Sequence, residues 1–130
     1  MSPLDQRERD LVKCEDMRIH AKQACQFLGS RSEVEFVADE MLQAAVIRCV
    51  EVIGEAARQV SQETRQRAPQ IPWSMIIGMR NVLAHDYGAV DLDRVYSVVS
   101  DQLPELIDHV GDLISTLEGE VGWREENEEE

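Results

Sequence analysis

Apolar residues recur along most of this chain at alternating intervals of three and four, the spacing that turns one face of an α-helix inward. This spacing predicts one long helix over residues 4–28. Gly29 and Ser30 should close that helix, because glycine readily adopts the left-handed conformation of a helix end. Arg18 lies on the same stripe, where it is a charged exception among apolar residues. The apolar members of the stripe are Leu11, Cys14, Ala21, Cys25 and Leu28.

A second long helical pattern runs from residue 33 to residue 60. At its start, Ser32 and Glu35 have the capping-box spacing, in which each side chain bonds to the backbone N–H of the other residue. The apolar spacing weakens near residues 37–39, where we expect a break in the helix.

Shorter helices are expected in the second half of the chain. Residues 61–68 form a polar helical pattern, and a helix opened by Pro72 should stop near residues 85–88. Asp91 can cap a further helix, and Pro104 is expected to start the last one.

The predicted fold class is therefore all-α, a bundle of antiparallel long helices plus shorter C-terminal helices. No run of alternating β-branched residues, internal repeat or linker interrupts the helical pattern. At 130 residues the chain has the length of one domain, which we place at residues 1–118. The acidic residues 119–130 are expected to form a disordered tail.

The net charge of −13 excludes broad, sequence-independent binding to nucleic acid, because the bulk field of the protein repels phosphates. Only part of this charge comes from residues 124–130, which hold five Glu against one Arg. An RNA substrate would have to bind at a local basic site. Residues 58–67, which contain three arginines, are a candidate for this site. The alternative is that these arginines are ordinary surface charges. The same acidity favours a basic partner.

Cysteine usage and the lack of long apolar runs indicate a cytoplasmic protein without a membrane segment. Three cysteines cannot all pair within one chain, and each lies in an apolar helical pattern, which is typical of reduced core thiols. Residues 1–30 carry charges throughout, so no secretory leader is expected. His20 and His109 have no metal-ligand partner at helical spacing, and there is no Gly-rich phosphate loop, so we predict no metal site and no cofactor.

The candidate chemistry lies in residues 80–87, where Arg80, His85 and Tyr87 fall within eight residues. In an unbroken helix positions 80 and 85 differ by about 140° around the axis, so the helix must end near residue 85 for the two side chains to meet. A neutral imidazole can take the proton of a ribose 2′-hydroxyl, and a guanidinium can stabilise the charge that develops on a phosphate. A symmetric dimer would supply two such pairs, one for each proton transfer. The same residues also fit a plain helix end, with His85 near the negative end of the helix dipole and Arg80 on the surface.

The wider sequence around this motif resembles the HepT-like toxins of the HEPN superfamily of helical ribonucleases. The Arg-x4-His-x-Tyr spacing is shared, as are Ile53-Gly54-Glu55-Ala56-Ala57 and Ile71-Pro72-Trp73. Residues 90–104, with Val90-Asp91, Val95-Tyr96 and Asp101-Gln102-Leu103-Pro104, are similar to the family pattern downstream of the motif. The resemblance covers about residues 33–110 in the family's order.

This resemblance implies a HEPN-type helical bundle that forms a homodimer and acts as a metal-independent endoribonuclease, the toxin of a toxin–antitoxin pair. It implies that Arg80 and His85 are catalytic, with Asn81 and Glu55 as supporting residues. The antitoxin would be an MntA-like nucleotidyltransferase that neutralises the toxin by AMPylation of Tyr87. The alternative is a non-catalytic HEPN module that binds and dimerises beside a nucleotidyltransferase, which the overall acidity favours.

Overall fold

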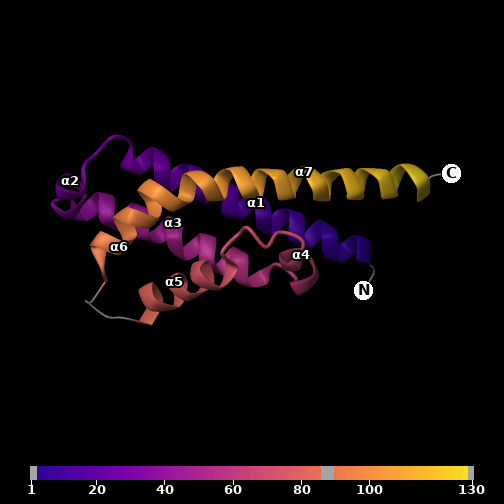
Figure 1. Ribbon diagram of the computed structural model, residues 1–130, viewed down its shortest axis with the longest axis horizontal. Coiled ribbons are helices and arrows are strands. Elements are labelled where there is room, and N and C mark those ends of the chain that lie inside the picture. The colour runs from indigo at the N-terminus through magenta and orange to yellow at the C-terminus, as the bar shows by residue number, and fades with distance from the viewer. Residues whose placement is uncertain (1–2, 86–89, 129–130) are drawn as a thin grey trace.

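The computed structural model describes the backbone of residues 3–85 and 90–128 and the side chains of residues 6–79 and 90–122. Within these ranges all regular structure is helical, which confirms the predicted all-α bundle. Three long helices form its body: α1 (Pro3–Leu28), α3 (Glu40–Gln59) and α7 (Leu103–Glu128). Helix α1 packs against both α3 and α7, while α5 (Trp73–His85) covers another side of α3 (Figure 1).

The remaining helices are short: α2 (Glu33–Val37), α4 (Gln62–Gln66), α6 (Leu92–Ser97) and the π-helical segment η1 (Val98–Gln102). Helices α2 and α6 contact each other at one end of the bundle, and both termini lie toward the other end (Figure 1). Helix α4 lies between α3 and α5, so it determines where the chain turns back toward the predicted motif.

The helix ends follow the capping residues predicted from the sequence. Glu35 N donates to the Ser32 hydroxyl at 3.2 Å and Ser32 N to the Glu35 carboxylate at 3.1 Å, so the capping box is formed. Gly29 has φ 58°, the left-handed conformation expected where α1 ends. The expected break near residues 37–39 is also present, since α2 ends at Val37 and α3 begins at Glu40.

The last helix, α7, begins at Leu103, one residue before the predicted start at Pro104, but it is not separated from the helices before it. Helix α6, η1 and α7 follow one another without a gap, and the N–H of Leu103 donates to the carbonyl of Val98, five residues earlier. Proline has no N–H, and its ring collides with the carbonyl four residues before it in a regular helix. A wider π turn directly before Pro104 relieves that collision, so the chain stays helical through it.

Helix α7 continues beyond the boundary that we placed at Glu118, and its backbone is helical to Glu128. The physical reason is visible at Glu120, whose carboxylate pairs with Arg67 and, at 3.3 Å, with Arg7. These two contacts fasten the C-terminal part of α7 to the segment after α4 and to α1. The domain boundary at residue 118 and the expected disorder of residues 119–130 stay predictions.

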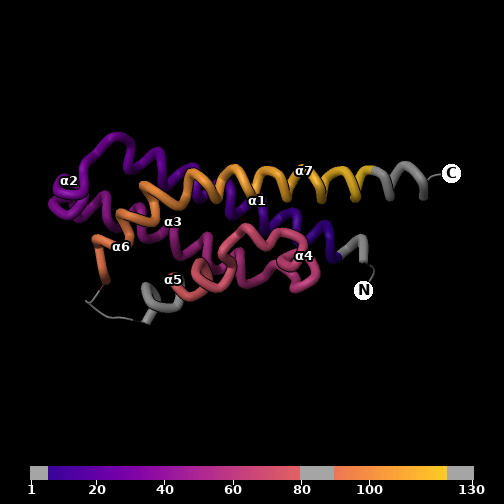
Figure 2. The backbone as a smooth tube through the Cα atoms, in the orientation of Figure 1, coloured from indigo at the N-terminus to yellow at the C-terminus, as the bar shows by residue number. Residues whose placement is uncertain are grey.

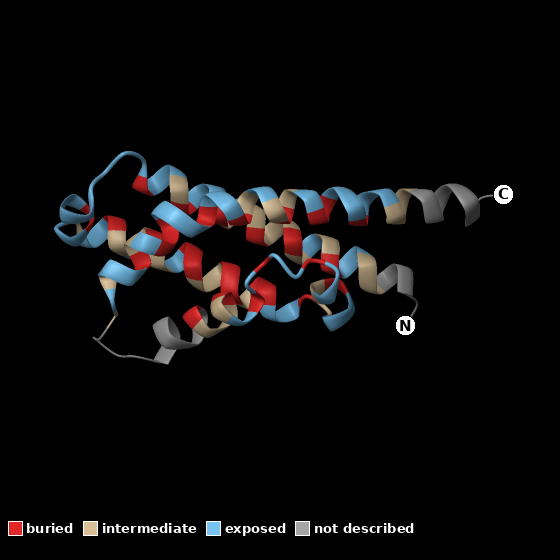
Figure 3. Cartoon of the chain, in the orientation of Figure 1, coloured by how far each residue is buried: buried red, intermediate tan, exposed pale blue. Residues whose placement is uncertain are grey.

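The core lies where α1, α3, α5 and α7 face one another, as the buried positions in Figure 3 show. Cys14, Met17 and Ala21 of α1 are fully buried, and so is Val46 of α3. Arg18, the polar departure from the α1 stripe, is half-buried and donates to Glu15 at 2.8 and 2.9 Å. None of the helices in the described ranges is both long and apolar enough to cross a bilayer.

Candidate functional site

Helix α5 carries the predicted motif, and its first two turns are anchored in the core. Trp73, Ile76 and Met79 are buried, and the indole Nε1–H of Trp73 donates to the carbonyl of Ala68 at 3.1 Å. Trp73 is therefore part of the core and is not exposed for stacking on a substrate. The backbone of α5 is therefore fixed up to the residue that directly precedes Arg80.

The predicted catalytic residues follow on the same helix. Arg80, Asn81 and His85 belong to the last part of α5, whose described backbone reaches His85, while their side chains lie outside the described residues (grey in Figure 2). Tyr87 lies outside the described residues altogether. The predicted contact between the guanidinium and the imidazole therefore remains a prediction.

A small apolar pocket of about 30 Å³ lies beneath α5. Met75 and Met79 of α5 line it together with Ile53 of α3 and Leu103 and Leu106 of α7. This volume accommodates little more than one or two water molecules, so the pocket is part of the packing that supports α5 and is too small for a nucleotide.

Glu55, predicted as a supporting residue, lies on α3 and is partly exposed. Its carboxylate accepts hydrogen bonds from Arg58 at 2.7 Å and from Gln59 at 2.8 Å. It also lines an open surface pocket between α1 and α3, together with Lys13 and Asp16. Its role beside the motif stays a prediction.

The locally basic stretch of residues 58–67, considered as an RNA footprint, is engaged within the protein. Arg58 pairs with Glu55, and the Arg65 guanidinium donates to the carbonyls of Val60 at 3.0 Å and Arg58 at 2.7 Å. Arg67 pairs with Glu120. These contacts favour the reading of all three arginines as structural surface charges.

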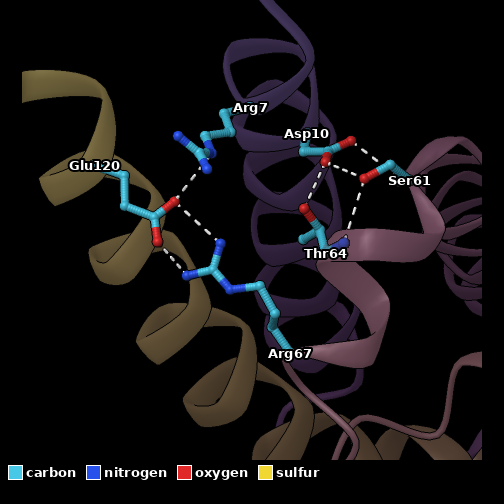
Figure 4. A network of polar contacts seen from close by, with 6 residues as sticks. All are labelled: Arg7, Asp10, Ser61, Thr64, Arg67 and Glu120. Carbon is cyan, nitrogen blue, oxygen red and sulfur yellow. Dashed lines mark hydrogen bonds and ion pairs between the residues drawn. The ribbon is translucent and has the colours of Figure 1, made fainter. Parts of the chain in front are cut away.

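A buried polar network around Asp10 was not predicted from the sequence (Figure 4). Asp10 is only 1% exposed, and its carboxylate accepts from Ser61 N at 3.0 Å, Ser61 Oγ at 2.6 Å and Thr64 Oγ1 at 2.6 Å. Gln6 donates a fourth hydrogen bond at 3.0 Å. Because Ser61 also caps α4, this network fixes the turn between α3 and α4 to α1. One signal was available: Asp10 stands four residues before Cys14, in register with the apolar stripe.

Glu120 forms a second polar cluster with Arg7 and Arg67 (Figure 4). The hydrogen bond from Arg67 is the main cause that lowers the pKa of Glu120, although partial burial opposes it. The same bond raises the pKa of Arg67. Because Glu120 is more acidic in the fold than in the unfolded chain, its contribution to stability is present at neutral pH and is lost as the pH falls through its folded pKa.

The cysteines are free thiols, of which Cys14 and Cys49 are buried and Cys25 is half-buried. Burial is the main cause that raises the pKa of Cys14 to about 12, and it also raises the pKa of Cys25 and Cys49. These groups stay protonated at neutral pH, which makes them poor nucleophiles. Among the residues described, no group of His, Cys, Asp and Glu is arranged to hold a metal ion.

Comparison with known proteins places the chain among ribonucleases. The family model described as ribonuclease HepT-like matches residues 17–113. A protein of Methanocaldococcus jannaschii named as a candidate RNase is 36% identical over 72 residues, which are 55% of this chain and 66% of that protein. A protein of Caldanaerobacter subterraneus subsp. tengcongensis, also named as a candidate RNase, is 34% identical over 99 residues, 73% of this chain and 88% of its own. A probable ribonuclease HepT of Thermococcus cleftensis is 36% identical over 72 residues, 55% of this chain and 66% of its own. No solved structure matches the chain significantly.

Proposed function

Because the chain belongs to the HepT-like ribonuclease family, we propose that it is a metal-independent endoribonuclease whose active centre contains Arg80 and His85. The observation that carries this proposal is the family match over residues 17–113, which spans the whole Arg-x4-His-x-Tyr motif. The anchoring of α5 up to Met79 supports it, because a rigid helix holds the following residues in a defined place.

In the proposed reaction His85 takes the proton of a ribose 2′-hydroxyl. The 2′-oxygen then attacks the adjacent phosphorus, the bond from phosphorus to the 5′-oxygen breaks, and a 2′,3′-cyclic phosphate remains. Arg80 stabilises the negative charge on the phosphate oxygens during this step, and Asn81 and Glu55 support the pair. The leaving 5′-oxygen needs a proton, which His85 of the partner subunit supplies in a symmetric dimer.

The biological role that fits this activity is that of a cytoplasmic toxin in a toxin–antitoxin pair. Unrestrained cleavage of cellular RNA would stop growth, so the cell needs a partner that neutralises the enzyme. The net charge of −13 also favours a substrate bound at one local basic site over general binding to nucleic acid.

The proposed activity is tested with purified protein, an RNA oligonucleotide and its all-2′-deoxy counterpart, in the presence of EDTA. We expect cleavage of the RNA to a product ending in a cyclic phosphate, and no cleavage of the DNA, which lacks the nucleophile. Arg80→Ala should cleave about 100-fold more slowly or worse. Arg48→Ala, which removes a surface arginine paired with Glu51, is the matched control and should keep full activity. Equal activity in the unaltered protein, Arg80→Ala and Arg48→Ala would indicate that a contaminating nuclease cleaves the RNA. Activity that is present only without EDTA would contradict the metal-independent mechanism.

Neutralisation is proposed to occur by AMPylation of Tyr87 by a nucleotidyltransferase antitoxin. The phenolic oxygen attacks the α-phosphorus of ATP, pyrophosphate leaves and the phenolic proton is released. A bulky anionic group two residues from His85 would then occupy the place of an RNA phosphate and repel it. With the nucleotidyltransferase and ATP, the intact mass should rise by whole adenylyl groups. Tyr87→Phe should abolish the rise, whereas Tyr96→Phe, on α6, should not. Modification that persists in Tyr87→Phe would contradict this assignment.

A further inference from the structure

The end of the bundle formed by α2 and the start of α3 exposes large apolar side chains. Val34 is 79% exposed and Met41 is 84% exposed, well beyond the other large apolar residues of the described chain. Val37 and Phe27 are also exposed. We call these four residues, Phe27, Val34, Val37 and Met41, the α2 face.

The members of the α2 face lie close together. Val34 and Val37 are three residues apart on α2 and so share one side of it. Gln43 of α3 donates to the carbonyls of Phe36 at 3.0 Å and Val37 at 2.8 Å, which holds the end of α2 against the first turn of α3, where Met41 lies.

The antiparallel packing of α1 and α3 puts the end of α1, which carries Phe27, at the same end of the bundle as the start of α3 (Figure 1). The thiol of Cys49 contacts the Gln23 side chain at 3.5 Å, so residue 23 of α1 faces residue 49 of α3. One turn further along α1, Phe27 lies opposite residue 45, one turn from Met41. The exposure of this end is visible in Figure 3.

Carboxylates predominate around the α2 face, although Arg31 donates to the carbonyl of Phe27 at its edge. Residues 32–47 contain four acidic residues and no Lys or Arg. On the neighbouring α6, Asp93 forms a hydrogen bond with Glu33, and this contact is the main cause that raises the pKa of Glu33. A carboxyl group whose pKa is raised by a neighbouring carboxyl group lies in a region of concentrated negative charge. The four acidic residues are Glu33, Glu35, Asp39 and Glu40.

This combination of charge and apolar exposure identifies the class of occupant. A second copy of the chain in twofold contact would bring two acidic rims face to face, which is unfavourable. RNA and anionic lipid would be repelled by the same carboxylates. A protein surface with apolar side chains at its centre and Lys and Arg around them is complementary to the α2 face, because its apolar centre covers the exposed apolar residues and its basic rim pairs with the carboxylates.

We propose that the α2 face is a docking surface for a partner protein that presents apolar side chains within a basic rim. This surface is separate from α5, and its use does not depend on RNA cleavage.

The test uses a synthetic amphipathic helix with leucine on one face and lysine around it, and the same helix with glutamate in place of lysine. We expect the lysine helix to bind the full chain, to shift the backbone amide resonances of residues 33–41, and to bind more weakly as salt rises. The glutamate helix should not bind. The double variant Val34→Ser/Met41→Ser should lower the affinity for the lysine helix about tenfold or more, because both buried apolar contacts are lost.

The matched control is Val12→Ser/Ile19→Ser, which removes two apolar residues of α1 that are 56% and 54% exposed. It should leave the affinity unchanged. All four replaced side chains are exposed, so a thermal melt should show both variants folded. Equal binding by both variants, amide shifts away from residues 33–41, or no binding of the lysine helix would overturn the proposal. So would a loss of self-association in Val34→Ser/Met41→Ser, since the occupant would then be a second copy.

Discussion

Replacing His85 with alanine is expected to lower the rate of RNA cleavage about 100- to 10,000-fold, because the proposed general base is lost. The loss should appear in kcat, with little change in KM, since the imidazole acts on the proton that moves in the transition state and contributes little to ground-state binding. The rates are measured under multiple-turnover conditions at several concentrations of a labelled RNA oligonucleotide in EDTA, which gives kcat and KM separately.

Two further measurements separate a chemical role of His85 from a structural one. Free imidazole added to the His85→Ala protein should restore part of the activity, because it can take the proton in place of the missing side chain. The control His109→Ala, which removes a half-buried histidine of α7, should cleave at the unaltered rate. Wild-type activity in His85→Ala, or activity lost equally in both variants, would remove His85 from the mechanism.

Replacing Asp10 with alanine is expected to lower the free energy of unfolding by about 3 kcal/mol. The carboxylate is 1% exposed and accepts hydrogen bonds from Gln6, Ser61 and Thr64. Its removal leaves the backbone N–H of Ser61 and two hydroxyl groups without their acceptor, and it opens a cavity between α1 and α4. Urea unfolding followed by circular dichroism at one fixed protein concentration measures the change.

The control and the double variant test whether the loss comes from this network. Asp16→Ala removes a half-exposed carboxylate of the same helix and should change the free energy by less than about 0.5 kcal/mol. If Asp10 and Thr64 act together, the loss in Asp10→Ala/Thr64→Val should fall short of the sum of the single losses by about 1 kcal/mol. Strict additivity, or a loss in Asp10→Ala no larger than in Asp16→Ala, would contradict the role that we give to Asp10.

Local features of the fold were predictable because their causes lie within a few residues of the chain. The capping box of Ser32 and Glu35, the left-handed Gly29 and the cap at Asp91, whose side chain accepts from Arg94 N at 3.2 Å, all depend on neighbours in sequence. Two features of the last part of the chain had causes outside that range. A π turn was needed to keep Pro104 within a helix, and Glu120 was held by side chains of distant segments.

The sequence by itself determined the all-α class, most helix ends, the family and the motif, because periodicity, caps and residue spacing are local properties. Only the tertiary structure decided what distant residues do to one another. It paired Asp10 with Ser61 and Thr64, engaged the arginines of residues 58–67 in contacts within the protein, and left Val34 and Met41 uncovered. Such pairings depend on how separate helices pack, and helix periodicity specifies which face turns inward but not which side chain it meets.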